Sequence, residues 1–202
     1  MDIDRADEFR TAAARNLERG NADTDDIEKF ATHADNLEGV DGLNSGPVDD
    51  FVDAGARGNA GDPGNVKGAL REVRRADEIG SENIRKMSVE LRDGNDIKGE
   101  LDIQRTNGDI VESKSSFGFD PERVNDQFER KLSTMRDHPD VDFDGNTLEV
   151  RATHVDDHSM VRSEITELED EIAESAEWNN ADITIEVRDE RTGTVITRET
   201  EA

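Results

Sequence analysis

The sequence predicts an α/β (α+β) fold in which helices flank a mixed sheet. Two observations lead to this prediction. From residue 66 onward, apolar residues recur first at helical spacing and then at the period of two that is typical of strands. The resulting order of elements is α-β-β-β-α-β, followed by a helix and a β-hairpin. We therefore expect a helical accessory or linker region over residues 1–63 and a main domain over residues 64–202.

The accessory region is expected to contain two helices, over residues 5–18 and 25–37, because apolar residues recur there every three or four positions. A tract rich in Gly, Asn, Asp and Pro runs from Gly39 to Asn65, with a short helix expected near residues 48–54. This tract sets the domain boundary. The residue types before it suggest no chemistry of their own.

The main domain begins with a helix over residues 66–79, in which Glu72 lies between an apolar stripe and a basic face. Residues 84–92 alternate between apolar and polar, which predicts a half-buried strand. The further elements expected in the core, residues 66–153, are a hairpin over residues 99–114, a helix that Asp120 caps and Pro121 begins, and a strand over residues 147–153. A C-terminal helix and hairpin are expected over residues 159–198.

The composition is strongly acidic, with 51 Asp and Glu against 25 Lys and Arg and a net charge of −26. Arg outnumbers Lys, and acid-rich, lysine-poor surfaces resemble those of proteins from salt-loving archaea. A folded protein can carry such charge in molar salt, because the screening length falls to about 3 Å and repulsion between the charges weakens. The alternative is an acidic, partly disordered protein.

The chain contains no cysteine, which excludes disulfides and thiolate chemistry. It has no apolar run of the length that crosses a membrane, and its first residues do not resemble a secretory signal. We therefore expect a cytoplasmic protein without membrane partners, while export as part of a larger protein stays open.

The turn of the hairpin over residues 99–114 can close in two ways. A two-residue loop would pair Ile103 with Glu112 and place an apolar side chain beside a carboxylate. A three-residue loop with Gly108 in the left-handed conformation pairs Ile103 with Val111 instead. Because a slip of one residue turns every side chain to the other face, the hydrophobic pattern should decide, and it favours the three-residue loop.

This register gathers Glu100, Asp102, Glu112 and Lys114 on one face, with Asp102 opposite Glu112. Two carboxylates about 5 Å apart repel each other unless positive charge lies between them. Lys114 supplies one charge, and Mg²⁺ would supply more because it prefers oxygen ligands. A lysine there could also orient or help to deprotonate an attacking water. The structural alternative is an exposed strand pair with ordinary salt bridges.

Asp102, followed ten residues later by Glu112-Ser113-Lys114, resembles the motif of the PD-(D/E)XK nuclease superfamily. Residues 68–76 are similar to the first core helix of that family, which often carries a further acid, and the resemblance covers roughly residues 66–153. It implies a restriction-endonuclease-like fold, a Mg²⁺ cofactor for which Mn²⁺ can substitute, and hydrolysis of phosphodiester bonds, in DNA rather than RNA.

By this resemblance, Asp102 and Glu112 bind the metal with the main-chain carbonyl of Ser113, and Lys114 is the catalytic lysine. Glu72 is the accessory acid. Gly99-Glu100 replaces the Pro-Asp dipeptide of the family, which leaves open whether Glu100 or Asp102 binds the metal. We favour Asp102 because the preferred register places it opposite Glu112.

Residues 64–136 hold 14 of the 25 basic residues and are nearly neutral, which suits a surface that binds phosphate. The candidates for nucleic-acid contacts are Lys67, Arg71, Arg74, Arg75, Arg123, Gln127, Arg130 and Lys131. Residues 65–70 and 99–102 are also similar to nuclease domains of polymorphic toxins, which implies an inhibitory or immunity partner. A homodimer is a further expected assembly. The alternative function is a non-catalytic module that binds nucleic acid or protein.

Overall fold

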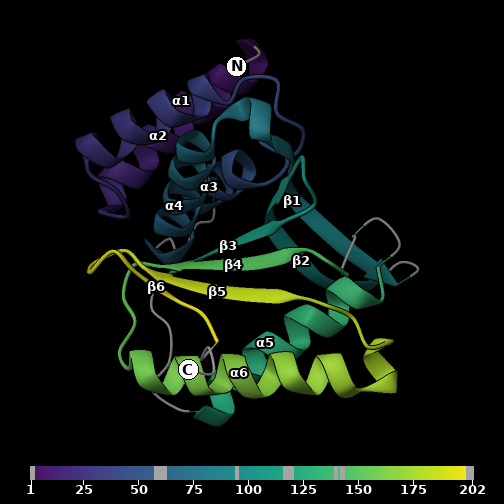
Figure 1. The fold of residues 1–202 in the computed structure, drawn as a ribbon. Helices are drawn as coiled ribbons and strands as arrows, with labels where there is room; N and C mark the ends of the chain where they lie inside the picture. The colour runs from purple at the N-terminus through teal and green to yellow at the C-terminus, as the bar shows by residue number, and fades with distance from the viewer. Residues whose placement is uncertain are drawn as a thin grey trace. The chain divides into compact units, whose positions relative to one another are not determined.

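The computed structural model describes residues 3–56, 63–93, 96–115, 121–138, 141 and 144–198. The chain forms two compact units, Met1–Val89 and Glu90–Ala202. Helices dominate the first unit, and the second contains most of a sheet with two long helices (Figure 1). The fold is therefore α+β with a mixed sheet, as the sequence predicts.

The first unit is a bundle of helices around stacked aromatic rings. Its helices are α1 (Ile3–Arg19), α2 (Thr24–Asn36), α3 (Pro47–Ala56) and α4 (Pro63–Ile79). The rings of Phe9, Phe30 and Phe51 have centroids 4.5–5.6 Å apart. Each of these three side chains is at most 8% exposed, so burial of their apolar area holds α1, α2 and α3 together.

Helix α4 packs against α2 and α3 and therefore belongs to the first unit. Its buried residues include Val66 and Val73, two members of the apolar stripe expected from the sequence. The first unit thus extends past residue 63, where the change in composition suggested a boundary, and includes the start of strand β1 (Ile84–Asp93).

Strand β1 departs from the simple alternation expected for residues 84–92. Ser88 has a φ of 48° and is 9% exposed, so it is buried together with its neighbours Met87 and Val89. The main-chain N–H of Met87 donates to the carbonyl of Asp41 at 2.8 Å. The loop from Asp41 lies so close that a Cβ on Gly46 would be 1.7 Å from the Ser88 hydroxyl. This packing explains why the polar position is buried.

The sheet has the strand order β1-β2-β3-β4-β5-β6. Its further strands are β2 (Asp96–Arg105), β3 (Ile110–Lys114), β4 (Thr147–Ala152), β5 (Thr184–Asp189) and β6 (Thr194–Ile196). Strands β3, β4 and β5 are parallel, whereas β2 and β6 run antiparallel to their neighbours β3 and β5. The expected order of elements along the chain is confirmed.

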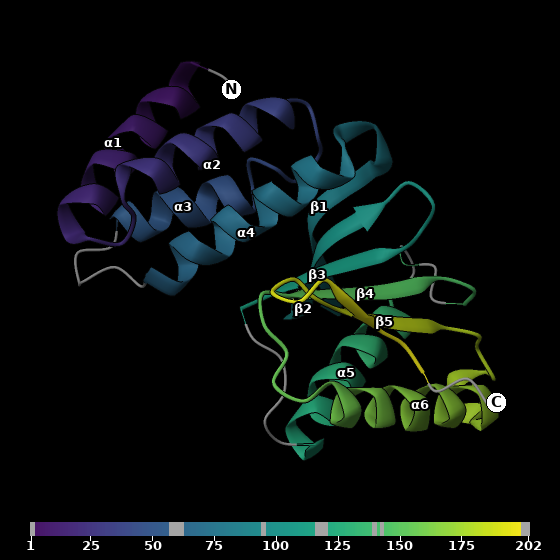
Figure 2. The same ribbon diagram turned by 60° about the vertical axis from the view of Figure 1, so that its left-hand side comes forward.

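Helices α5 (Pro121–Arg136) and α6 (His158–Glu174) lie side by side on one face of the sheet (Figure 2). They bury an apolar layer against the strands. The layer comprises Phe128, Leu132, Met135, Val161, Ile165, Leu168 and Ile172 from the helices and Ile110, Leu148, Val150, Ile185 and Val187 from the strands. Each fully buried side chain of this size contributes about 1.5–3 kcal/mol. Within the described residues, no helix has the length and apolar character needed to cross a membrane.

Candidate functional site

The hairpin of β2 and β3 closes through a three-residue loop, which confirms the register chosen from the hydrophobic pattern. Arg105 N–H donates to the carbonyl of Asp109 at 2.8 Å, and Gly108 N–H donates to the carbonyl of Arg105 at 3.1 Å. Gly108 has a φ of 101°, a conformation that glycine adopts without strain. Ile103 pairs with Val111, and both side chains are fully buried. Burial of this pair therefore decides the register.

Asp102 and Glu112 consequently lie opposite each other on one face. The main-chain N–H of Ser113 donates to Asp102 Oδ2 at 2.6 Å, and the main-chain N–H of Asp102 donates to Glu112 Oε1 at 3.3 Å. Each carboxylate is thus held by the backbone of the strand that carries the other. Glu112 is 1% exposed, so this side chain is a buried charge.

Two lysines neutralise Glu112. Lys114 Nζ lies 3.5 Å from Glu112 Oε2, as expected for residues two apart on one strand. Lys131 Nζ, from α5, lies 2.9 Å from the same oxygen and also donates to the main-chain carbonyl of Glu100. We expected Lys131 at a surface that binds nucleic acid, whereas the structure places its ammonium group beside Glu112.

The pair of acids shares one electrostatic environment. Burial and the neighbouring charge of Glu112 raise the pKa of Asp102 to about 7, against the opposing effects of Lys114, Lys131 and the Ser113 N–H. Asp102 therefore resists ionisation, and a divalent cation beside it would favour the charged form. Such a group can hold either a proton or a cation near neutral pH.

The carboxylate oxygens of this pair are suitable ligands for a hard cation. Glu112 Oε2 is buried and accepts no hydrogen bond within the described residues, although both ammonium groups pair with it. Mg²⁺ commonly takes one or two protein carboxylates and fills its other positions with water and substrate phosphate. Across the part of the chain that the structure describes, no cluster of three or more His, Asp or Glu forms a larger metal-ligand set.

The other predicted site residues lie apart from this pair in the sequence. Glu72 and the candidate phosphate contacts Lys67, Arg71 and Arg74 belong to α4 in the first unit. Arg75 also lies on α4, but its side chain is fully buried. This burial does not fit the expected contact of Arg75 with a nucleic-acid backbone.

On α5, Arg130 is exposed and lies one residue before Lys131. Arg123 and Gln127 fall in the part of α5 where the structure describes the backbone alone, so their side-chain roles lie outside the described residues. The structure therefore brings together the predicted catalytic and metal-binding residues Asp102, Glu112, Ser113 and Lys114. Lys131, predicted as a nucleic-acid contact, joins them.

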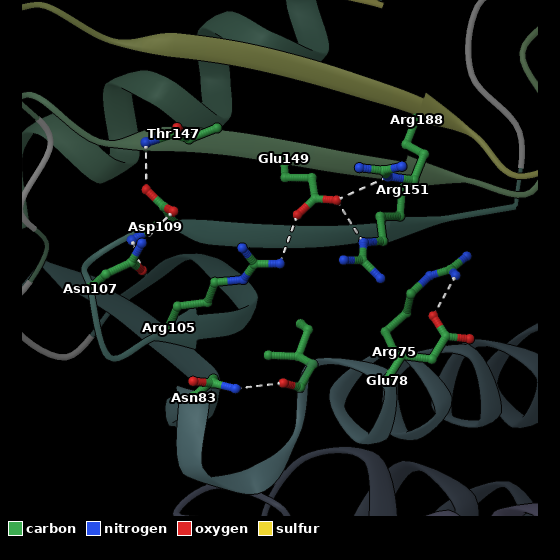
Figure 3. A network of polar contacts seen from close by, with 11 residues as sticks. Arg75, Glu78, Asn83, Arg105, Asn107, Asp109, Thr147, Glu149, Arg151 and Arg188 are labelled. Carbon is green, nitrogen blue, oxygen red and sulfur yellow. Dashed lines mark hydrogen bonds and ion pairs between the residues drawn. The ribbon is translucent and has the colours of Figure 1, made fainter. Parts of the chain in front are cut away.

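A second charged cluster, which the sequence did not predict, occupies the face of the same sheet opposite to Asp102 and Glu112 (Figure 3). Glu149 is 5% exposed and pairs with Arg151 at 2.7 Å, Arg105 at 3.0 Å and Arg188 at 3.3 Å. Burial opposes ionisation of Glu149, but the hydrogen bond from Arg151 and the three positive charges outweigh it and hold its pKa below the usual value. This cluster ties β2, β4 and β5 together.

Comparisons with protein-family models, with characterised proteins and with solved structures find no match to this chain. The site is therefore interpreted from its own geometry. It consists of two apposed carboxylates on a buried hairpin face, with one partly exposed and one more deeply buried lysine.

Proposed function

We propose that this chain is a metal-dependent endonuclease that hydrolyses phosphodiester bonds in nucleic acid, in DNA rather than RNA. The observation that carries the proposal is the meeting of Asp102 and Glu112 across the hairpin with Lys114 beside them. The chain order α4-β1-β2-β3-α5-β4 supports a restriction-endonuclease-like core.

In this proposal Asp102 and Glu112, with the main-chain carbonyl of Ser113, hold Mg²⁺ or Mn²⁺. The bound cation would polarise the phosphodiester and make water a better nucleophile at neutral pH. Lys114 is 39% exposed at its side chain, so its ammonium can reach a water or a phosphate oxygen while staying close to Glu112. In the same proposal Glu72 is the accessory acid, and Gln127 contacts the substrate.

The proposed nucleic-acid contacts are Lys67, Arg71, Arg74, Arg123, Arg130 and Lys131. The resemblance to toxin nucleases extends the proposal to a role as a toxin or a defence or repair effector, restrained by an inhibitory partner. A homodimer is the proposed assembly for cutting both strands of a duplex.

The second candidate function is a non-catalytic module that binds nucleic acid. One observation favours it: Lys114 and Lys131 already neutralise the acids, so the carboxylates are paired without a cation. A nuclease assay separates the two functions. Purified protein is incubated with supercoiled DNA or with RNA in molar KCl, with Mg²⁺, with Mn²⁺ or with EDTA.

We expect the wild-type protein to cleave DNA in the presence of either metal. Glu112→Gln and Lys114→Ala should each lower the rate by about 10²–10⁴-fold, since each removes a group that acts on the reacting atoms. Glu171→Gln, an exposed position on α6, is the matched control and should cleave normally. Equal cleavage by all four proteins would contradict the proposal, and binding without cleavage would support the non-catalytic module.

A further inference from the structure

We infer that Lys131 is a second functional lysine of this site, which neutralises Glu112 in the cation-free protein and moves to substrate phosphate when a divalent cation is bound. The exchange couples cation uptake to nucleic-acid binding. This inference rests on the proposed function and deepens it, because it names how the same site is regulated.

The position of Lys131 on its helix supports this role. Phe128, three residues earlier, and Met135, four residues later, are buried at 2% and 0% exposure. Residues at these spacings share a helix face, so the apolar stem of Lys131 lies along the buried stripe and its ammonium ends at the carboxylates. The side chain is 21% exposed, compared with 39% for Lys114.

Lys131 lies closer to Glu112 than Lys114 does. Lys131 Nζ is 2.9 Å from Glu112 Oε2, whereas Lys114 Nζ is 3.5 Å from the same oxygen. Lys131 also donates to the main-chain carbonyl of Glu100, on the strand that carries Asp102. Lys131 is thus the closer counter-ion of Glu112, and it bridges β2 and β3 from α5.

Charge balance then sets a condition on cation binding. When both carboxylates are ionised, as a bound cation favours, they and the two ammonium groups sum to zero. A divalent cation would then leave the site with an excess of two positive charges. A divalent cation and an ammonium about 5 Å apart repel enough to weaken binding about tenfold even in water. Cation affinity should therefore be low until an anion compensates or an ammonium leaves.

A nucleic-acid phosphate supplies that anion. When Lys131 leaves Glu112, its ammonium is available to a phosphate oxygen, so phosphate and cation each favour binding of the other. Thermodynamic linkage requires the effect to be equal in both directions. Lys114, on β3 and more exposed, can stay beside Glu112 during the exchange.

The test measures binding rather than cleavage. Mn²⁺ binding is followed by electron paramagnetic resonance, and binding of a fluorescent phosphorothioate duplex is followed by anisotropy with Mn²⁺ or with EDTA, at one KCl concentration. Lys131→Gln should bind Mn²⁺ about tenfold more tightly than the wild-type protein without nucleic acid. Its gain in duplex affinity on adding Mn²⁺ should be about tenfold smaller.

Two variants separate charge from packing. Lys131→Arg retains the competing charge and should bind Mn²⁺ within about threefold of the wild-type protein. Lys29→Gln, which removes an exposed lysine of α2, should change neither measurement. If Lys131→Gln fails to fold, Lys131→Met keeps the apolar stem and serves the same comparison.

Unchanged or weaker Mn²⁺ binding by Lys131→Gln would overturn the inference. The proposed function fails in a different way, namely if Glu112→Gln binds Mn²⁺ as tightly as the wild-type protein does. Loss of Mn²⁺ binding in Glu112→Gln together with unchanged binding in Lys131→Gln would leave the nuclease proposal standing and remove the role of Lys131.

Discussion

Replacing Glu149 with Gln removes the carboxylate that Arg105, Arg151 and Arg188 share, while it keeps the size of the side chain. Removing one partner of a buried ion pair typically costs about 3–5 kcal/mol, because the remaining charge stays buried without compensation. The side chains of Glu149 and Arg151 are 7% and 13% exposed, so the cost of breaking this pair should fall within that range.

The other two arginines lower the expected cost. Arg105 and Arg188 are 27% and 40% exposed at their side chains, so water can hydrate them after the carboxylate is lost. We therefore expect Glu149→Gln to lower the free energy of unfolding of the second unit by about 3 kcal/mol at pH 7. Glu171→Gln, exposed on α6, should change it by less than about 0.5 kcal/mol.

Urea unfolding in molar KCl, followed by tryptophan fluorescence, measures this difference. Trp178 is the single tryptophan of the chain, lies in the second unit and is 7% exposed, so its emission reports on that unit. The cation–π contact with Arg136, at 4.5 Å, also disappears on unfolding.

The pH dependence gives an independent check. The pKa of Glu149 is lowered in the folded protein, so its contribution is complete above the ordinary carboxyl pKa of about 4.5 and is lost as the pH falls through the folded value. The difference between Glu149→Gln and wild type should therefore persist from pH 7 to about pH 5 and shrink below about pH 4. A difference below about 0.5 kcal/mol at pH 7, or one of equal size at pH 3, would refute the reasoning.

Two further predictions concern the hairpin and the net charge. Gly108→Ala should cost about 1–2 kcal/mol, because Gly108 has a φ of 101°, and should also reduce cleavage by loosening the register that apposes the acids. Gly193→Ala, in the β5–β6 turn with a φ of 74°, also places a Cβ at a positive φ, although no atom lies within 4 Å of that Cβ, and it should spare cleavage. Equal losses of cleavage in the two variants would contradict the role of the register. The melting temperature should rise between 0.1 and 2 M KCl, because screening relieves repulsion in a chain of net charge −26. A melting temperature that stays constant or falls over that range of KCl would argue against adaptation to salt.

Local patterns in the sequence predict most elements correctly, because a helix or strand brings residues of one spacing to one face whatever surrounds it. In the hairpin, such local patterns also predicted which site residues lie opposite each other. Ile103 and Val111 had to share a face to be buried, and that requirement alone placed Asp102 opposite Glu112. The core of the candidate site was therefore predictable.

Contacts between distant elements were not predictable in this way. The sequence places Lys131 on a helix beside apolar positions, but only the packing of α5 on the sheet directs its ammonium to Glu112. Glu149 and its arginines come from three strands, and their meeting depends on the order and register of those strands. Arg75 and Ser88 have polar side chains that local periodicity places outside, and tertiary packing buries both.

The sequence by itself determined the elements, their order and the apposition of Asp102 and Glu112, because these follow from local periodicity and from a turn of fixed length. Tertiary structure alone decided which charges meet those acids, where the first compact unit ends, and that a second charged cluster lies on the opposite face. These features depend on contacts between residues far apart in the chain, which no local pattern encodes.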